Sequence, residues 1–306
     1  MNRREFVKTA GLAVGGAVLG SAGLRAQGGN ARGPYKISLA QWSINGAFTQ
    51  RGGTLDNLEF AKVARENGYE AIEYVNQFFM DKAKDAAYLA EMNRVSNGEG
   101  ITHVLIMIDG EGRIGDPDAA KRNQAVEGHF KWVDAAKTLN CHAIRVNAHG
   151  GPGSWEDQLA LTTEGYQRIV EYGAQQGINI IIENHGGLSS DPTFLLQMMQ
   201  KVNNPRAGVL PDFGNFRKGE GEPAEYVDGY EAVRMLMPHA KGLSAKRNMR
   251  LADGEQVPVD FERMMRIALD AGFRGYVGVE YGGLEGIRAA REELDAVRQK
   301  VAPQYT

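Results

Sequence analysis

The chain has 306 residues, of which 42% are hydrophobic and 24% are charged, a balance that excludes disordered and fibrous proteins. Its formal net charge of −3 gives no sign of a nucleic-acid-binding surface. The single cysteine, Cys141, excludes an intrachain disulfide, and its place at the start of an apolar run predicts a buried structural thiol rather than a reactive one.

Residues 1–26 are typical of an export signal. Arg3 and Arg4 precede Phe6, and a short apolar stretch from Ala10 to Leu19 is followed by small residues up to Ala26. The paired arginines and the weak, glycine-rich apolar stretch resemble a twin-arginine signal, which carries folded proteins across the membrane. We therefore expect a periplasmic or otherwise extracytoplasmic protein, without a membrane segment once the signal is removed. An uncleaved membrane anchor is the alternative.

A polar linker at 27–33 leads into eight short apolar runs, most of them rich in Ile, Val and Leu with little alternation, as expected for strands buried on both faces. The runs are Lys36–Gln41, Ala71–Tyr74, Ile101–Ile108, Ala143–Asn147, Ile178–Glu183, Ala207–Leu210, Gly242–Ala245 and Tyr276–Glu280.

Amphipathic helical patterns separate these runs. They cover Leu55–Asn67, Ala119–Thr138, Tyr166–Gln176, Thr193–Val202, Tyr226–Met237, Phe261–Ala271 and Ile287–Val301. Asp191 and Asp260 are predicted N-caps, and Gly68, Gly177 and Gly272 are predicted to end helices. Eight strands alternating with helices predict an α/β fold, a single (β/α)₈ TIM barrel over residues 34–306. The alternative, an open doubly wound sheet, lacks support because no glycine-rich dinucleotide loop follows the first run.

Three of the runs end with an acidic residue: Glu183, Asp212 and Glu280. Active sites of (β/α)₈ barrels lie at the C-terminal ends of the strands, so these carboxylates should converge. They would need a cation or a shared proton to coexist. A divalent ion suits them, with Mn²⁺ or Mg²⁺ preferred for oxygen ligands and Zn²⁺ or Co²⁺ admitted if imidazole joins. The alternative is that each acid caps a helix.

With these motifs the chain resembles the xylose isomerase-like sugar phosphate isomerase/epimerase family over about residues 35–300. The resemblance is carried by Glu183 after an isoleucine run, Asp212 in Pro-Asp-Phe-Gly-Asn-Phe and Glu280 in Val-Gly-Val-Glu-Tyr. The segment Asn184–Gly187 is similar to exported members of this family. The resemblance implies a metal held by Glu, Asp, His and Glu from strands five to eight. It also implies that Glu183 and Glu280 exchange a proton at the carbon next to a sugar carbonyl.

One position departs from the family pattern. Ser244 stands where the resemblance implies a histidine ligand, so the fourth ligand is open, with His185 or His149 as replacements. Lys246 is a candidate catalytic residue, because a lysine among carboxylates could neutralise charge, bind a sugar oxygen or act as an acid. A solvated loop lysine is the alternative.

Other polar or aromatic residues near the strand ends are candidate substrate-binding residues. They are Trp42, Arg145, His149, His185 and Asn215. The sequence thus predicts a metal-dependent sugar isomerase or epimerase acting on a small carbohydrate. A metal-assisted lyase or hydrolase on keto-glycosides and a non-catalytic periplasmic sugar-binding barrel are the alternatives. A homo-oligomer stays open, and so does phosphorylation of the sugar, although export argues against it.

Overall fold

Residues 33–305 are described by a computed structural model, in which each of the eight predicted runs contains a parallel strand. The strands are β1 (Lys36–Ala40), β2 (Ala71–Val75), β3 (Thr102–Met107), β4 (Ala143–Val146), β5 (Asn179–Glu183), β6 (Ala207–Leu210), β7 (Leu243–Ala245) and β10 (Tyr276–Val279). They form one eight-stranded sheet in the order β6-β5-β4-β3-β2-β1-β10-β7. The prediction of eight strands is confirmed.

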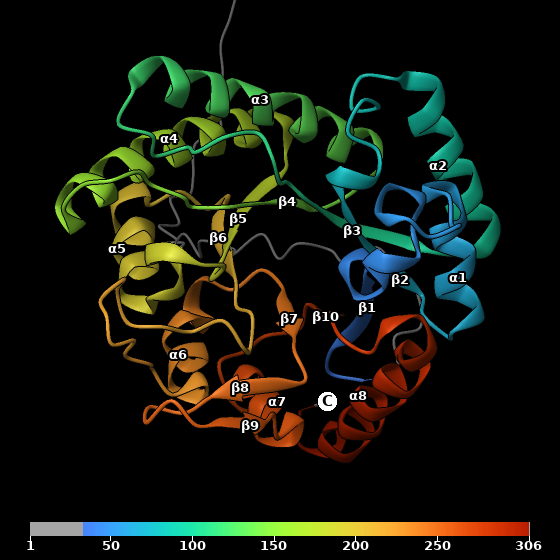
Figure 1. Cartoon of the computed structure of the whole chain (residues 1–306). Coiled ribbons are helices and arrows are strands. Elements are labelled where there is room, and N and C mark those ends of the chain that lie inside the picture. The colour runs from blue at the N-terminus through green and yellow to red at the C-terminus, as the bar shows by residue number, and fades with distance from the viewer. Residues whose placement is uncertain (1–32, 306) are drawn as a thin grey trace, which may run out of the picture. The chain divides into compact units, whose positions relative to one another are not determined.

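The two edge strands of this sheet, β6 and β7, come together and close it. The Lys241 amide donates to the Val209 carbonyl at 3.0 Å, and the Ser244 amide donates to the Pro211 carbonyl at 2.9 Å. The Phe213 amide donates back to Ser244 at 3.1 Å. The fold is therefore the predicted (β/α)₈ TIM barrel, with strands at the centre and helices around them (Figure 1).

The helices are α1 (Phe60–Glu66), α2 (Ala86–Glu99), α3 (Ala119–Thr138), α4 (Trp155–Gln176), α5 (Pro192–Val202), α6 (Gly229–Leu236), α7 (Phe261–Asp270) and α8 (Gly283–Tyr305). The predicted caps are confirmed, since the side chains of Asp191 and Asp260 accept from the first-turn amides of α5 and α7. Gly177 ends α4 in the left-handed conformation, with φ of 80°. Within 33–305 no helix is long and apolar enough to cross a membrane.

Several helix boundaries differ from the predicted ones, and some elements were not predicted. Helix α2 was missed because only Leu89, Met92 and Ser96 are buried in it. Only two of these three are apolar, which is too few to give a clear pattern. Helix α4 begins at Trp155, well before the predicted Tyr166. A small hairpin of β8 (Asn248–Arg250) and β9 (Gln256–Pro258) was also missed, because its strands are short and largely solvent-facing.

The apolar core lies mainly between the strands and the surrounding helices, and a group of buried polar residues lies along and just beyond the strands. On β4, Ile144 and Val146 belong to the apolar core, while Arg145 between them lines the barrel mouth. This follows from the alternation of side chains along a strand. Cys141 is buried and unpaired, as predicted.

The predicted signal at 1–26, and residues 27–32 of the predicted linker, lie outside the described residues. The proposed division of the chain into signal, linker and barrel therefore stays a prediction.

Candidate active site

Four strands deliver charged side chains to the same end of the barrel. Glu183 is the last residue of β5, and Asp212 lies two residues beyond the end of β6. Lys246 directly follows β7, and Glu280 directly follows β10. Because the C-terminal ends of barrel strands meet at one face, residues far apart in the sequence become neighbours there.

The carboxylates of Glu183, Asp212 and Glu280 form a cluster in which one oxygen from each lies within 4.8 Å of the others. Glu183 is 1% exposed and Asp212 is fully buried. Burial of three carboxylates is strongly unfavourable unless cations or protons compensate them. Within residues 33–305 this is the one group of acidic, histidine and cysteine side chains close enough to share a metal ion.

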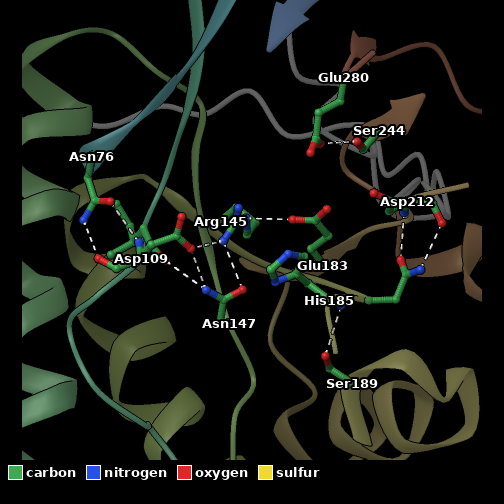
Figure 2. Close-up of polar contacts among 12 residues, drawn as sticks. Asn76, Asp109, Arg145, Asn147, Glu183, His185, Ser189, Asp212, Ser244 and Glu280 are labelled. Carbon is green, nitrogen blue, oxygen red and sulfur yellow. Dashed lines mark hydrogen bonds and ion pairs between the residues drawn. The ribbon is translucent and has the colours of Figure 1, made fainter. Parts of the chain in front are cut away.

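Lys246 and Ser244 both contact Glu280. The Lys246 ammonium is paired with Glu280 Oε1 and lies 3.4 Å from Asp212 Oδ2. The Ser244 hydroxyl donates to Glu280 Oε2 at 2.7 Å (Figure 2). Ser244 therefore orients a carboxylate of the cluster, at the position where the resemblance implies a metal ligand.

Arg145 joins the cluster from β4. Its Nε lies 2.9 Å from Glu183 Oε2, although the two groups are not aligned for a hydrogen bond and both atoms lack one among the described residues. Its Nη1 donates to Asp109 Oδ1 at 2.9 Å and to Asn147 Oδ1 at 3.0 Å. Arg145 is only 5% exposed. It therefore links Glu183 to a second acid, as Figure 2 shows.

The second acid, Asp109, follows β3 and is hydrogen-bonded at both carboxylate oxygens. Besides the Arg145 contact, Oδ1 accepts from Asn147 Nδ2 at 2.7 Å, and Oδ2 accepts from Gln77 Nε2 at 3.1 Å. This network holds the guanidinium in place, because a planar donor bound at two sides has little freedom to rotate.

Two asparagines hold the backbone of the acids at the barrel mouth. Asn184 donates to the Asp212 carbonyl at 2.9 Å and accepts from the Asp212 amide at 2.7 Å. Asn76 makes the same pair of bonds to the Asp109 backbone, both at 2.9 Å (Figure 2). Both asparagines are fully buried. They position the two aspartates from the preceding strand.

Some carboxylate oxygens in the cluster have no hydrogen-bond donor in the described part of the chain. They are Glu183 Oε2 and Asp212 Oδ2, both with almost no solvent contact. Buried carboxylate oxygens without donors are costly. Buried carboxylate oxygens are the ligand atoms that a hard divalent cation prefers, so these residues fit such an ion.

Burial is the main influence on the charge of these acids. It raises the pKa of Glu183 to about 7, with Arg145 opposing the shift and Glu280 adding to it. Burial also raises the pKa of Asp212 well above its ordinary value, against the opposing influence of Lys246. For Lys246, burial alone would lower the pKa, but the Asp212 and Glu280 carboxylates outweigh it and raise that pKa. The site therefore keeps its lysine charged and holds two acids, Glu183 and Asp212, whose pKa values are raised by burial.

A cavity of about 290 Å³ lies beside the cluster. Four of the predicted substrate-binding residues line it, with Glu280 in its wall: Trp42, Arg145, His149 and His185. His149 Nε2 lies 3.2 Å from the His185 carbonyl oxygen, so the two loops are joined across the cavity wall. Asn215 lines a different hollow, together with Lys246 and Arg247.

Most members of the supporting network were not singled out from the sequence. Asn76, Gln77, Asn147 and Asn184 contribute only amides, and a lone amide in a sequence has no distinctive pattern. Each of the three asparagines does directly follow a strand, namely β2, β4 and β5. That position was the available signal, because residues just beyond a barrel strand face the mouth.

The profile of the family described as "Xylose isomerase-like TIM barrel" matches residues 61–300. An uncharacterized protein of Methanocaldococcus jannaschii is 23% identical over 195 residues, which cover 59% of this chain and 66% of that protein. The match thus spans just under two thirds of that relative.

Three solved structures share the fold. A xylose isomerase-like TIM barrel protein from Mycobacterium smegmatis, in complex with magnesium, has a TM-score of 0.69 at 16% identity, covering 89% of this chain and 98% of that one. The 3-keto-D-glucoside 4-epimerase of E. coli has a TM-score of 0.66 at 14% identity, with 87% and 99% covered. The D-psicose 3-epimerase of Clostridium cellulolyticum with D-tagatose has a TM-score of 0.65 at 13% identity, with 86% and 99% covered.

Proposed function

This chain belongs to the xylose isomerase-like TIM barrel family, and from that premise we propose that it is a divalent-metal-dependent sugar epimerase or isomerase. One observation carries the proposal. Oxygens of Glu183, Asp212 and Glu280 lie within 4.8 Å of one another. They stand beside a cavity whose wall includes Glu280 and polar and aromatic side chains.

The substrate we propose is a small carbohydrate. Two of the similar structures are described as sugar epimerases, one for a 3-keto-D-glucoside and one for D-psicose. The cavity of about 290 Å³ is at the small end of ligand pockets, which suits a single sugar ring. Trp42 offers an apolar face to a ring, and His149 and His185 offer polar groups to its hydroxyls.

We propose that Glu183, Asp212 and Glu280 hold the ion. An all-oxygen set favours Mg²⁺ or Mn²⁺, and Zn²⁺ or Co²⁺ would call for an added imidazole. The M. smegmatis structure is a magnesium complex. When bound, the ion would polarise the sugar carbonyl and make the neighbouring C–H bond more acidic.

In this proposal the two glutamates exchange the proton. Arg145 lies against Oε2 of Glu183, so we assign Oε1 as the oxygen that takes or gives the proton. Its pKa of about 7 suits an acid–base group working near neutral pH. Glu280 follows β10, which is separated from β5 by β6 and β7 around the closed barrel. It is held by Ser244 and Lys246. Removal of the proton by one glutamate and return by the other would invert the carbon between them.

Exchange with solvent deuterium tests this function. The full protein, loaded with Mn²⁺, is incubated in D₂O with free ketoses and with a 3-keto-glucoside, and the sugars are followed by NMR. We expect deuterium at the carbon next to the carbonyl, together with a second epimer or isomer, and loss of both with a chelator. Absence of exchange from all substrates in the Mn²⁺-loaded protein would refute the proposal.

Two alternatives are separated by the same experiment. A lyase or hydrolase acting on keto-glycosides would release the aglycone after the same proton removal, so a freed alcohol would appear by NMR. A non-catalytic sugar-binding barrel is favoured by Ser244, which contributes no nitrogen donor. Such a protein would show no deuterium exchange by NMR, although calorimetry would detect sugar binding.

We also propose that residues 1–26 direct twin-arginine export, because Arg3 and Arg4 precede a weakly apolar stretch. Replacing both arginines by lysine should trap the precursor in the cytoplasm, as measured by fractionation. Continued export of the double variant would refute this.

A further inference from the structure

Lys246 contacts the same carboxylate oxygens that a metal ion would need. Asp212 Oδ1 accepts from the Gly214 amide at 2.7 Å, and Glu280 Oε2 accepts from Ser244 at 2.7 Å. These bonds leave Asp212 Oδ2 and Glu280 Oε1 for a cation. They are the two atoms against which the Lys246 ammonium lies.

The lysine satisfies this acidic site only in part. Its distance of 3.4 Å from Asp212 Oδ2 is that of an ion pair, and this buried oxygen has no hydrogen-bond donor within residues 33–305. Glu183 Oε2 also lacks one, and none of the ion pairs found in that range joins Lys246 to Glu183. An ion at the centre of the cluster would reach all three carboxylates, whereas the ammonium pairs with two.

A hollow beside Lys246 offers its side chain a second position. Its side chain is 23% exposed, unlike the fully buried Asp212. It borders a hollow of about 420 Å³ that is lined by Asn215, Arg247 and Asn248 among others. Rotation of its flexible stem could carry the ammonium from the cluster into this hollow without moving the backbone.

We propose that Lys246 is a displaceable internal cation: its ammonium holds the Asp212 and Glu280 carboxylates in the metal-free protein and leaves them when a divalent ion binds. A divalent ion and an ammonium at the same two oxygens repel each other, so they exclude one another. Lys246 therefore sets the metal affinity of the site. The inference rests on the proposed function only for the presence of a divalent ion.

A matched pair of variants tests this by calorimetry. Lys246→Met removes the ammonium and keeps the stem, whereas Lys62→Met makes the same change at an exposed lysine that pairs with Glu66 on α1, outside the cluster. Titration of the chelator-treated full protein with MnCl₂ should show Lys246→Met binding Mn²⁺ at least about tenfold more tightly than the parent, because a charge-assisted contact no longer competes. Lys62→Met should match the parent.

Unchanged or weaker Mn²⁺ binding by a folded Lys246→Met protein would overturn the inference, and so would failure of all three proteins to bind Mn²⁺. Circular dichroism establishes that the variants fold. If Lys246→Met does not fold, the parent protein decides the matter by a second measurement.

The second measurement is acetylation of lysines in the parent protein, followed by mass spectrometry. Displacement predicts that Mn²⁺ increases the rate of modification at Lys246 several-fold. Lys62, whose side chain is 63% exposed on the surface, should be modified at the same rate with and without the ion. A Lys246 rate that Mn²⁺ leaves unchanged or slows would overturn the inference.

These outcomes are separate from those of the proposed function. Tighter Mn²⁺ binding by Lys246→Met in a protein that exchanges no sugar proton would support displacement and refute the epimerase proposal. Metal-dependent proton exchange in the parent, with no gain of affinity in Lys246→Met, would do the reverse.

Discussion

Two places at the barrel mouth, one around Asp109 and one around Asp212, hold their aspartate by the same two backbone hydrogen bonds. They give its carboxylate different partners. Asn76 follows β2 and binds the backbone of Asp109, two residues beyond β3. Asn184 follows β5 and binds the backbone of Asp212, two residues beyond β6.

The two carboxylates then differ in their partners. Both oxygens of Asp109 accept hydrogen bonds, whereas Asp212 Oδ2 is buried without a donor among the described residues. The same pair of asparagine–backbone hydrogen bonds thus supports a structural acid in one place and a candidate cation ligand in the other. Position after a strand does not decide the role of an acid. The donors that the neighbouring strands supply decide it.

The largest effect we predict concerns Glu183, which lies between the two places and contacts Arg145. Glu183→Gln keeps the shape of the side chain but cannot accept and return a proton. We expect sugar turnover to fall by about 10²- to 10⁴-fold, the usual contribution of a general acid–base group. Steady-state kinetics measures this, with the surface variant Lys62→Met as the control that retains activity. Unchanged turnover in Glu183→Gln would remove the proton-transfer role.

Replacing each aspartate by asparagine should have different effects on stability and on Mn²⁺ binding in the two places. Asp109→Asn removes a charge partner of the buried Arg145, and breaking such a pair should lower the free energy of unfolding by about 3 kcal/mol or more. Asp212→Asn also removes a partner of Lys246, but burial and the Glu183 and Glu280 carboxylates raise the pKa of Asp212, so stability should hold or rise while Mn²⁺ binding is lost. Urea unfolding and calorimetry measure both. Equal stability losses in the two variants would show that both aspartates are structural.

Glu73 on β2 extends the comparison to a third buried acid. Its Oε1 accepts from Ser38 at 2.6 Å, while Oε2 is another buried oxygen without a donor in the range 33–305. Burial raises the pKa of Glu73 from 4.5 to about 7, an effect that Ser38 opposes. Between these pH values the folded state therefore binds more protons than the unfolded state, and stability should fall as the pH rises.

The stability that Glu73 contributes is complete below about pH 4.5 and lost by about pH 7, a change of up to about 3 kcal/mol. Urea unfolding in the presence of a chelator, at pH 4.5 and pH 8, measures it. Glu73→Gln should flatten the pH dependence relative to the parent. A parallel pH dependence in the two proteins would mean that Glu73 ionises normally.

The smallest effects should come from the asparagines. Asn76→Ala and Asn184→Ala each leave one backbone amide and one carbonyl without their partner, so each should lose about 1 to 3 kcal/mol in urea unfolding. The variants should differ in metal binding, where Asn184→Ala alone should weaken Mn²⁺ binding by about tenfold, as loss of an outer-shell partner does. Equal weakening in both would mean that the Asp109 network also shapes the metal site.

Much of the fold could be predicted from the sequence. The eight strands follow from short apolar runs, because strands covered on both faces must be apolar almost throughout. The aspartate caps of α5 and α7 follow from local chemistry, in which a short acidic side chain satisfies free amides. Helix α2 and the β8–β9 hairpin were missed because they bury little apolar surface.

The positions of Glu183, Asp212 and Glu280 at or just beyond strand ends follow from local features of the sequence, namely an apolar run and the residues that end it. The surroundings of each acid, in contrast, come from the tertiary structure. It paired Arg145 with both Glu183 and Asp109, set Lys246 against Glu280 and Asp212, and placed Asn215 in another hollow. The physical reason is that charge and hydrogen bonding depend on distance in space, and barrel closure brings together strands that are distant in the chain.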